Sequence, residues 1–315
     1  MDENIGQKSS FSIASSIQKI YEEKYKQLLI IPFALLLIAF VFIGYKFAAT
    51  GEIINKDISL KGGITVTVLT QQEVNLLDVK KSLYSKFPEN DIAAKSITRF
   101  GAQSGLIIEA DIRQEQSAAI IEELGKILNK KLLPHDYAVE IVGSSLGKSF
   151  FKELIIALVI AFVFMALVVF ISFRTFIPSI AVLLAAFSDM IVTLAIVNIL
   201  DIEISAAGIA AFLMLIGYSV DTDILLSTRV LKRKEESEMD RIYGAIKTGL
   251  MMSATAIVAA IAALLVSQSE VIRQIMLILL IGLLIDLINT WIQNVGILRF
   301  YLERKSRKHQ HELQG

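Results

Sequence analysis

Four aspartates lie in stretches of the chain that are otherwise apolar enough to cross a lipid bilayer. They are Asp189 in AAFSDMIVT, Asp221 and Asp223 in GYSVDTDILLSTR, and Asp286 in IGLLIDLINTW. A charged carboxylate at the centre of a bilayer costs about 2.5–3.5 kcal/mol on insertion scales, so intramembrane acids usually mark ion pathways. Because a desolvated carboxyl group holds its proton more tightly than one in water, all four residues are candidates for a proton path.

Depth along the helices separates these candidates. At a rise of about 1.5 Å per residue, Asp189 lies about 18 Å and Asp221 about 12 Å from the inner edge, at similar depth on consecutive antiparallel helices. Asp221 and Asp223 are two residues apart and point about 200° apart, so they cannot both face one cavity. We expect Asp221 to take the deeper role beside Asp189, with Asp223 capping, pairing or lying near the inner rim.

A structural role is the alternative for each aspartate, because a buried carboxyl group can stay protonated or pair with a serine, threonine or lysine of a neighbouring helix. Three aspartate-bearing spans, two of them matched in depth, favour a functional role for the set. Asp286 has Asn289 and Thr290 on its own helix face. No basic residue lies mid-span, since Lys247 and Arg229 are near helix ends, where basic residues act as interface anchors.

Residue types exclude several other chemistries. The chain has no cysteine, which excludes disulfides, thiolate metal sites and cysteine nucleophiles. Two of its three histidines lie in the C-terminal tail, so we predict no metal and no other cofactor. An intramembrane aspartyl protease built on Asp189 and Asp221 is disfavoured because such proteases carry a GxGD-type motif, whereas Gly-Tyr-Ser-Val precedes Asp221. We therefore predict that the chain is not an enzyme. The net charge of zero gives no indication of a nucleic-acid partner.

Six segments are predicted to position the aspartates across the membrane. The 315-residue chain is 54% hydrophobic, with a mean hydropathy of +0.61, which indicates a membrane protein. A spanning helix needs roughly 20 mainly apolar residues. The stretches that qualify are 28–47, 154–173, 177–199, 206–226, 248–266 and 272–297. The apolar core of the first is too long for a cleaved signal peptide, so we expect a retained anchor.

Basic residues indicate the orientation of the bundle. Lysines and arginines precede the first predicted span, follow the sixth and fill the loop between the fourth and fifth, whereas the loops 200–205 and 267–273 hold only Arg273. By the positive-inside rule, residues 1–27 and the tail 298–315 are predicted to be cytoplasmic. Residues 51–150, between the first two spans, are then predicted to lie outside the cytoplasmic membrane.

The segment 51–150 has the patterns of a folded domain. Strands are predicted at 64–69, 96–100, 106–111 and 137–142, and amphipathic helices at 73–87 and 114–132. The turn GAQSG, 101–105, is predicted to join the second and third strands. The order βαββαβ is the ferredoxin-like pattern. The predicted fold is therefore an all-α membrane bundle of six helices with an extracytoplasmic α+β ferredoxin-like domain between the first two.

Two glycine-containing motifs flank this domain. DISLKGG begins at Asp57 and contains Gly62 and Gly63, and VGSSLGKSF contains Gly143 and Gly147. Glycine permits tight turns and close approach of the backbone. Alone, each motif indicates only a turn where the domain meets the membrane.

In this order and with these intervals, the motifs resemble the SecD/SecF family of protein-export membrane proteins, within the RND superfamily, and the archaeal SecF branch is the closer match. The resemblance rests on DISLKGG, VGSSLG, FSDMIVTLAI and the segment from Gly217 to Arg229, and it covers nearly the whole chain. It implies half of an RND-type membrane domain that assists Sec-dependent protein export, coupled to the proton gradient. The implied partners are SecD, the Sec translocon channel, the exported polypeptide and membrane lipid.

The chain also departs from the bacterial members of that family. Their fourth span has Gly-Tyr-Ser-hydrophobic-Asn-Asp-Thr, but here Asp221 stands at the asparagine and Thr222 at the aspartate, so Asp221 corresponds to the aspartate of the SecD version. Lys247 or Thr248 lies near the place of an arginine early in the bacterial fifth span.

The six-span pattern occurs only once in this sequence. Related transporters form their ion path between two repeats, so the chain is predicted to need a partner that supplies the second repeat. The alternative is a half-size RND-type proton-driven exporter of small molecules or lipids that pairs with itself. The small outer domain counts against that alternative, because it leaves little room for a substrate cleft.

Overall fold

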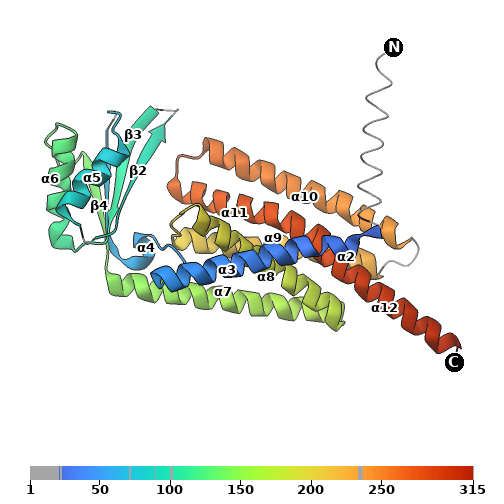
Figure 1. Ribbon diagram of the computed structural model, residues 1–315. Helices are drawn as coiled ribbons and strands as arrows, with labels where there is room; N and C mark the ends of the chain where they lie inside the picture. The colour runs from blue at the N-terminus through green and yellow to red at the C-terminus, as the bar shows by residue number, and fades with distance from the viewer. Residues whose placement is uncertain are drawn as a thin grey trace, which may run out of the picture.

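The computed structural model describes residues 21, 23–70, 72–88, 90–99, 102–232 and 237–314. A bundle of long helices carries a small domain with a four-stranded sheet at one end, and helix α12 projects from the other end (Figure 1). Most of the predicted N-terminal segment, residues 1–20, lies outside the described residues. So do residues 233–236 of the basic loop between the fourth and fifth spans.

Long apolar helices form six candidate membrane spans within these described ranges, as predicted. The first span joins the short helix α2 (Tyr25–Leu28) to α3 (Ile30–Thr50), and the next four are α7 (Ser144–Phe173), α8 (Phe176–Ile199), α9 (Ala206–Lys232) and α10 (Glu238–Val266). The sixth joins α11 (Glu270–Ile288), the π-helix η2 (Asn289–Asn294) and α12 (Val295–Gln314). Helix α7 begins at Ser144, inside the range 51–150 that was predicted for the outer domain. Its first turns are polar, so the apolar run in the sequence begins later than the helix does. The six spans indicate a multi-pass membrane protein.

Helices α8 and α9 form the centre of the bundle. More than half of the most apolar part of each is buried, but little of α7 or α10 is. Small side chains on α8, such as Ala181, Ala185 and Ser188, let neighbouring helices approach closely. Gly282 of α11 has the same function, because a Cβ at this position would lie 2.5 Å from the side chain of Leu215 in α9.

The small domain follows the order of strands and helices predicted from the sequence. Along the chain it consists of β1 (Gly63–Leu69), α5 (Leu76–Lys86), β2 (Ile92–Arg99), β3 (Ala102–Ala110), the short helix η1 (Gln114–Gln116), α6 (Ser117–Ile127) and β4 (Tyr137–Val142). The strand order is β2-β3-β1-β4, and every neighbouring pair is antiparallel. Helices α5 and α6 cover one face (Figure 1), where alternate strand residues such as Val66, Leu106 and Ile108 are fully buried.

The predicted GAQSG turn is wrong in its extent. Residues 102–105 belong to β3, which begins at Ala102, and β2 ends at Arg99. Residues 100–101 lie outside the described residues. Gly105 packs against β1, because a Cβ there would lie 2.7 Å from the carbonyl oxygen of Val68. A glycine that indicated a turn in the sequence therefore marks a close approach of two strands.

The two glycine-containing motifs that flank the domain lie against each other. Asp57 caps the short helix α4 (Ile58–Lys61), where its carboxylate accepts a hydrogen bond from a backbone N–H of the first turn. Gly63 has a φ of 144°, a conformation that side chains disfavour. A Cβ on Gly147, in the first turn of α7, would lie 2.9 Å from the backbone nitrogen of Gly62. The start and the end of the small domain are thus joined at the N-terminal end of α7.

The segment before β1 is tied to the loop between α8 and α9. Lys56 and Ile204 form an isolated parallel β-bridge, and the backbone N–H of Asp57 donates to the carbonyl oxygen of Ile204 at 3.1 Å. The side-chain amide of Asn55 donates to the carboxylate of Asp201 at 2.6 Å. These bonds hold the linker against the end of the bundle.

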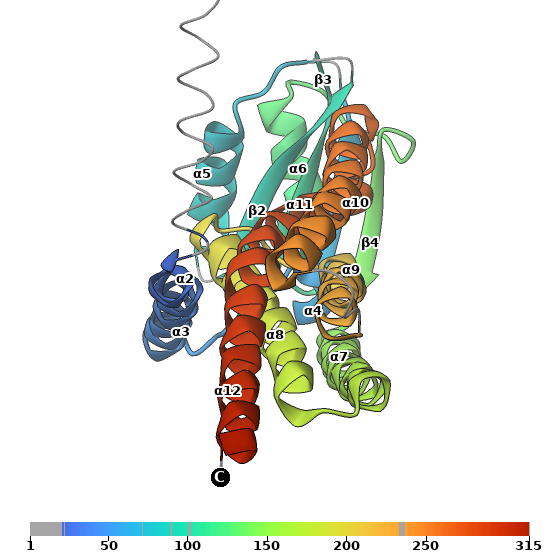
Figure 2. The same cartoon turned by 90° about the vertical axis from the view of Figure 1, so that its right-hand side faces the viewer.

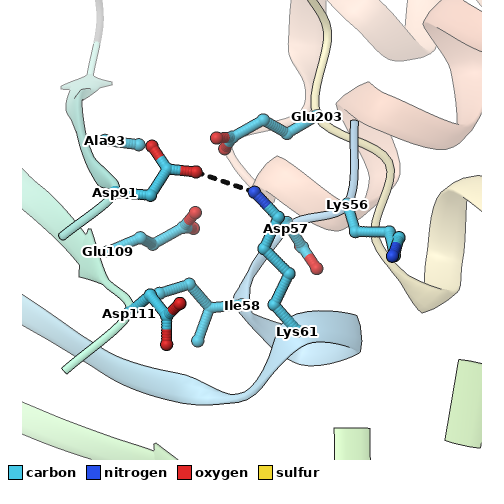
Figure 3. Close-up of a pocket in the computed structure, with 9 residues that line it drawn as sticks. All are labelled: Lys56, Asp57, Ile58, Lys61, Asp91, Ala93, Glu109, Asp111 and Glu203. Carbon is cyan, nitrogen blue, oxygen red and sulfur yellow. Dashed lines mark hydrogen bonds and ion pairs between the residues drawn. The ribbon is translucent and has the colours of Figure 1, made fainter. Parts of the chain in front are cut away.

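Charged side chains link the sheet to the same end of the bundle. Lys95 of β2 contacts carboxylates from three elements: Glu109 in β3 at 3.0 Å, Glu203 in the α8–α9 loop at 3.6 Å and Glu270 at the start of α11 at 3.5 Å. Close by, Lys61 pairs with Asp91 at 2.7 Å, facing Glu109 and Glu203 (Figure 3). Burial raises the pKa of Glu109 and of Glu203 even though Lys95 opposes the shift. For Lys95, burial lowers the pKa, but the surrounding carboxylates outweigh it and raise the pKa overall.

We expect Lys95→Met to weaken the small domain by about 1–3 kcal/mol near neutral pH, because the buried carboxylate of Glu109 loses its charged hydrogen-bond donor. Burial already raises the pKa of Glu109, so acidification protonates this carboxyl group early and removes the unpaired charge. The deficit should therefore shrink as the pH is lowered. Hydrogen exchange of β2 and β3 in the purified full-length protein, corrected for the intrinsic exchange rate at two pH values, measures it.

Lys126→Met is the matched control, because the Lys126 ion pair with Glu122 on α6 is exposed to solvent. Exposed ion pairs contribute little to stability, because water and salt screen the two charges. Equal losses in the two variants, or a Lys95→Met deficit that does not change with pH, would contradict this account of the junction.

Candidate functional site

Three of the four predicted aspartates come together inside the bundle. Asp189 of α8, Asp223 of α9 and Asp286 of α11 are each fully buried. The three helices pack on one another, and η2, which continues α11, lies against α8 and α9. Figure 2 views this arrangement along the bundle from the α12 end.

Asp189 accepts hydrogen bonds from two neighbouring segments. The hydroxyl of Ser219 in α9 donates to Oδ2 at 2.5 Å, and the side-chain amide of Asn289 in η2 donates to Oδ1 at 2.7 Å. Asp286 lies beside both Asp189 and Ser219. One carboxyl group thus connects α8, α9 and the sixth span.

Asp223 and Asp286 share the hydroxyl of Thr290. Thr290 Oγ1 lies 2.9 Å from Oδ1 of each carboxyl group. The side-chain amide of Asn294 donates to the same oxygen of Asp223 at 2.7 Å. The contacts therefore run through side chains from Asp189 and Ser219 to Asp286, Thr290 and Asp223.

Acceptor oxygens outnumber donors in this cluster. Five buried oxygens make no hydrogen bond within the described part of the chain: Oδ2 of Asp223 and Asp286, Oδ1 of Asn289 and Asn294, and Oε1 of Gln293. A buried polar atom without a partner costs about 1–3 kcal/mol, and an ionised carboxylate costs more. Protons on the carboxyl groups supply additional donors, so the cluster is chemically suited to hold and exchange protons.

The basic residues on the surrounding helices have partners elsewhere or face outward. Arg229 of α9 donates to the carbonyl oxygen of Gly244 in α10 at 2.5 Å, and Arg299 of α12 donates to that of Tyr21 at 2.9 Å. Lys247 of α10 is exposed. The cluster is therefore built from carboxyl, hydroxyl and amide groups. In the described ranges, no group of three or more histidine, aspartate or glutamate side chains is arranged to hold a metal ion.

Asp221 is not part of this cluster. The prediction that it lies beside Asp189 is wrong, because Asp221 is exposed on the surface of the bundle and Asp223 is buried in its place. The depth estimate found the right turn of α9, since Ser219 contacts Asp189, but depth alone does not say which face of a helix turns inward. Asp221 instead shares an exposed face with Tyr218. A place for Asp221 in the proton path stays a prediction.

Sequence reasoning missed two residues of the cluster. Gln293 and Asn294 of η2 are fully buried, and together with Asp286, Asn289 and Thr290 they follow the spacing of a single helix face. Extending the pattern of Asp286 by one more turn finds both residues in the sequence. The π-helical turn itself has no such signal, although π-helical turns occur frequently at functional sites.

The motif residues outside the cluster occupy two other regions. Asp57, Gly62, Gly63, Gly143 and Gly147 lie where the small domain meets the bundle. Gly217 is exposed, and a Cβ at this position would meet nothing within 4 Å. Arg229 joins α9 to α10 through its bond to Gly244.

Comparison with known proteins identifies relatives of this architecture. Residues 123–304 match the family model described as protein export membrane protein SecD/SecF, C-terminal. A protein-export membrane protein SecF of Methanolacinia petrolearia is 35% identical over 283 residues, covering 89% of this chain and 94% of the relative. The SecF of Pyrococcus furiosus is 36% identical over 298 residues, covering 94% of this chain and 97% of the relative.

Two solved structures share the fold. The crystal structure of SecDF, a translocon-associated membrane protein from Thermus thermophilus, has a TM-score of 0.71 at 18% identity, covering 89% of this chain and 38% of that chain. SecDF in a super-membrane-facing form has a TM-score of 0.54 at 20% identity, covering 89% and 39%. The present chain thus spans well under half of the solved SecDF chains. On the family match and on its identity to the curated relatives, the chain belongs to the SecD/SecF family of protein-export membrane proteins.

Proposed function

We propose that the chain assists Sec-dependent protein export across the cytoplasmic membrane, as the SecF-type half of a two-part membrane machine. The observation that carries this proposal is the 36% identity, over 94% of the chain, to a protein-export membrane protein. On this proposal the chain is a transport component that works on an exported polypeptide beside the Sec translocon channel.

We infer that the small domain is ferredoxin-like and lies on the outer side of the membrane. Its βαββαβ order and antiparallel β2-β3-β1-β4 sheet support the fold. Its position at the end opposite α12 supports the orientation, because the positive-inside rule puts basic segments in the cytoplasm (Figure 1). The described basic residues toward the α12 end include Arg229, Arg241, Arg304, Lys305 and Arg307. Both termini are then cytoplasmic, and the small domain can meet the polypeptide as it emerges.

A SecD-type partner is the second half of the proposed machine. The exposed carboxyl group of Asp221 supports this, because a polar group that faces lipid in the middle of a span is costly. The exposed face of α9 around Asp221 and Tyr218 is therefore a natural site for the partner's spans. Relatives with two repeats form their ion path at such a boundary.

The position of the interior cluster supports proton coupling. A proton that enters or leaves changes the hydrogen bonds among α8, α9 and the sixth span, because the carboxyl groups of Asp189, Asp223 and Asp286 join these helices. The α8–α9 loop and the start of α11 also hold Lys95 of the sheet, through Glu203 and Glu270. A rearrangement at the cluster can therefore reach the small domain through rigid helices.

We expect a cysteine at Tyr218 to crosslink to a cysteine on the membrane half of a co-expressed SecD-type partner, because this exposed face is the proposed contact. The chain has no cysteine of its own, so each crosslink reports one position. A cysteine at Val163, exposed on α7, is the control and should crosslink poorly. Equal yields at the two positions would contradict the partner face, and crosslinking of Tyr218→Cys only to a second copy of this chain would favour a self-paired exporter.

We expect Asp223→Asn to remove most of the dependence of export on the proton gradient, because the change keeps the size and hydrogen bonds of the side chain but abolishes its titration. Export rate measured against an applied pH gradient, in cells or inverted vesicles carrying the variant, tests this. Asp201→Asn is the matched control, since Asp201 lies in the α8–α9 loop and bonds to Asn55 outside the cluster. A gradient dependence of Asp223→Asn equal to that of wild type would mean that the buried carboxyl group is structural.

A further inference from the structure

A single hydroxyl group contacts two carboxyl groups in the interior cluster. Thr290 Oγ1 lies 2.9 Å from Oδ1 of Asp223 and 2.9 Å from Oδ1 of Asp286. A threonine hydroxyl carries one hydrogen and can donate it to only one oxygen at a time. The second contact is a hydrogen bond only if that carboxyl group carries a proton and donates it to Oγ1. The distances therefore favour one protonated and one ionised carboxyl group on the two sides of Thr290.

The surroundings leave this hydroxyl as the link between the two carboxyl groups. Asp223 comes from α9, Asp286 from α11, and Asn294 is the further donor to Asp223, at 2.7 Å. An amide nitrogen donates its N–H but does not readily accept a proton, so it cannot pass one on. A hydroxyl oxygen can accept a proton on one side and donate its own on the other. Thr290 is thus the group on this path with the chemistry of a relay.

Charged and titratable groups on the elements packed around Thr290 decide where its proton can go. Asp189 of α8 lies beside Asp286 and is the third carboxyl group of the cluster. On the other elements these groups are engaged or exposed: Tyr21 donates to the carbonyl oxygen of Trp291, Lys46 of α3 donates to Asn198, Arg229 of α9 donates to Gly244, Lys247 of α10 is exposed, and Arg299 of α12 donates to Tyr21. The shared proton is therefore governed by the three aspartates.

We propose that Thr290 is a proton relay between Asp286 and Asp223. In the forward step the protonated Asp286 gives its proton to Thr290 Oγ1 while the Thr290 hydroxyl gives its own hydrogen to the carboxylate of Asp223. Asp286 ends as a carboxylate, Asp223 as a carboxylic acid, and Thr290 as a neutral hydroxyl whose new hydrogen points toward Asp286. The net result is the transfer of one proton from the sixth span to α9.

This relay deepens the proposed function and rests on it for the source of the proton. It also gives the π-helical segment a role, since Thr290 and Asn294 of η2 both bond to Asp223. The direction of the Thr290 hydroxyl reports which helix holds the proton. The transfer of one proton thus reverses the direction of the hydrogen bonds between α9 and the sixth span.

The test uses infrared difference spectroscopy of the purified full-length protein during a pH titration. Bands of protonated carboxyl groups are assigned by their loss in Asp223→Asn and in Asp286→Asn. In wild type the two bands should change together, because the groups share one proton through Thr290. In Thr290→Val, which keeps the shape but lacks the hydroxyl, they should titrate separately. Thr290→Ser restores the hydroxyl and should restore the joint titration.

Export measured in the same variants separates this proposal from the proposed function. Thr290→Val should lose most of the gradient-dependent part of export, and Thr290→Ser should keep it. If Asp223→Asn exports normally, the proton-coupled function fails, but the infrared comparison still decides the relay. Jointly titrating bands in Thr290→Val, or separate bands in Thr290→Ser, would overturn the relay. Should the valine variant fail to insert, Thr290→Ala removes the same hydroxyl and is judged by the same bands.

Discussion

Three carboxyl groups are buried among apolar helices, with no cation beside them in the part of the chain that the structure describes. They are the constraint on which the rest of the bundle depends. Each needs donors that do not come from lysine or arginine, because an unpaired charge or acceptor is costly inside a membrane. Ser219 of α9 and Asn289, Thr290 and Asn294 of η2 provide these donors. The small residues of α8 and the glycine of α11 let the helices approach closely enough for these short side chains to meet. The tight centre of the bundle and its polar cluster therefore follow from the same requirement.

The helices that hold the cluster also carry the contacts of the small domain. The α8–α9 loop binds the linker before β1 through Ile204, and it offers Glu203 to Lys95 of the sheet. Helix α11 begins with Glu270, another partner of Lys95, and ends next to Thr290 in the cluster. A helix transmits a shift along its axis because its backbone hydrogen bonds resist stretching. The cluster and the sheet are thus joined through α11 and through the loop between α8 and α9.

Much of the fold was accessible from the sequence, but the contacts between distant elements were not. The six spans and the order of strands and helices follow from apolar run lengths and periodicity, which are local properties. The prediction that Asp221, and not Asp223, lies beside Asp189 was wrong. Helical spacing gives the angle between the two side chains, but it does not say which of them points to the centre of the bundle. Gln293 and Asn294 lay on a detectable polar stripe. The contacts of Lys95 with Glu203 and Glu270 join residues far apart in the chain, and no local pattern indicates them.

The two aspartates of α9 make sense as a pair on opposite faces of one helix. Asp223 faces inward to Thr290, and Asp221 faces outward on the surface proposed for a partner. Between them, Thr222 lies against Gly249 of α10, so α9 is also held from the side. A partner that contacts Asp221 then touches the same helical turn that bonds to the interior carboxyl groups. Any rotation of α9 about its axis changes both environments at once, because two residues on one rigid turn cannot move independently. Helix α9 alone therefore connects the hydrogen bonds of the interior cluster with the contacts made on its outer surface.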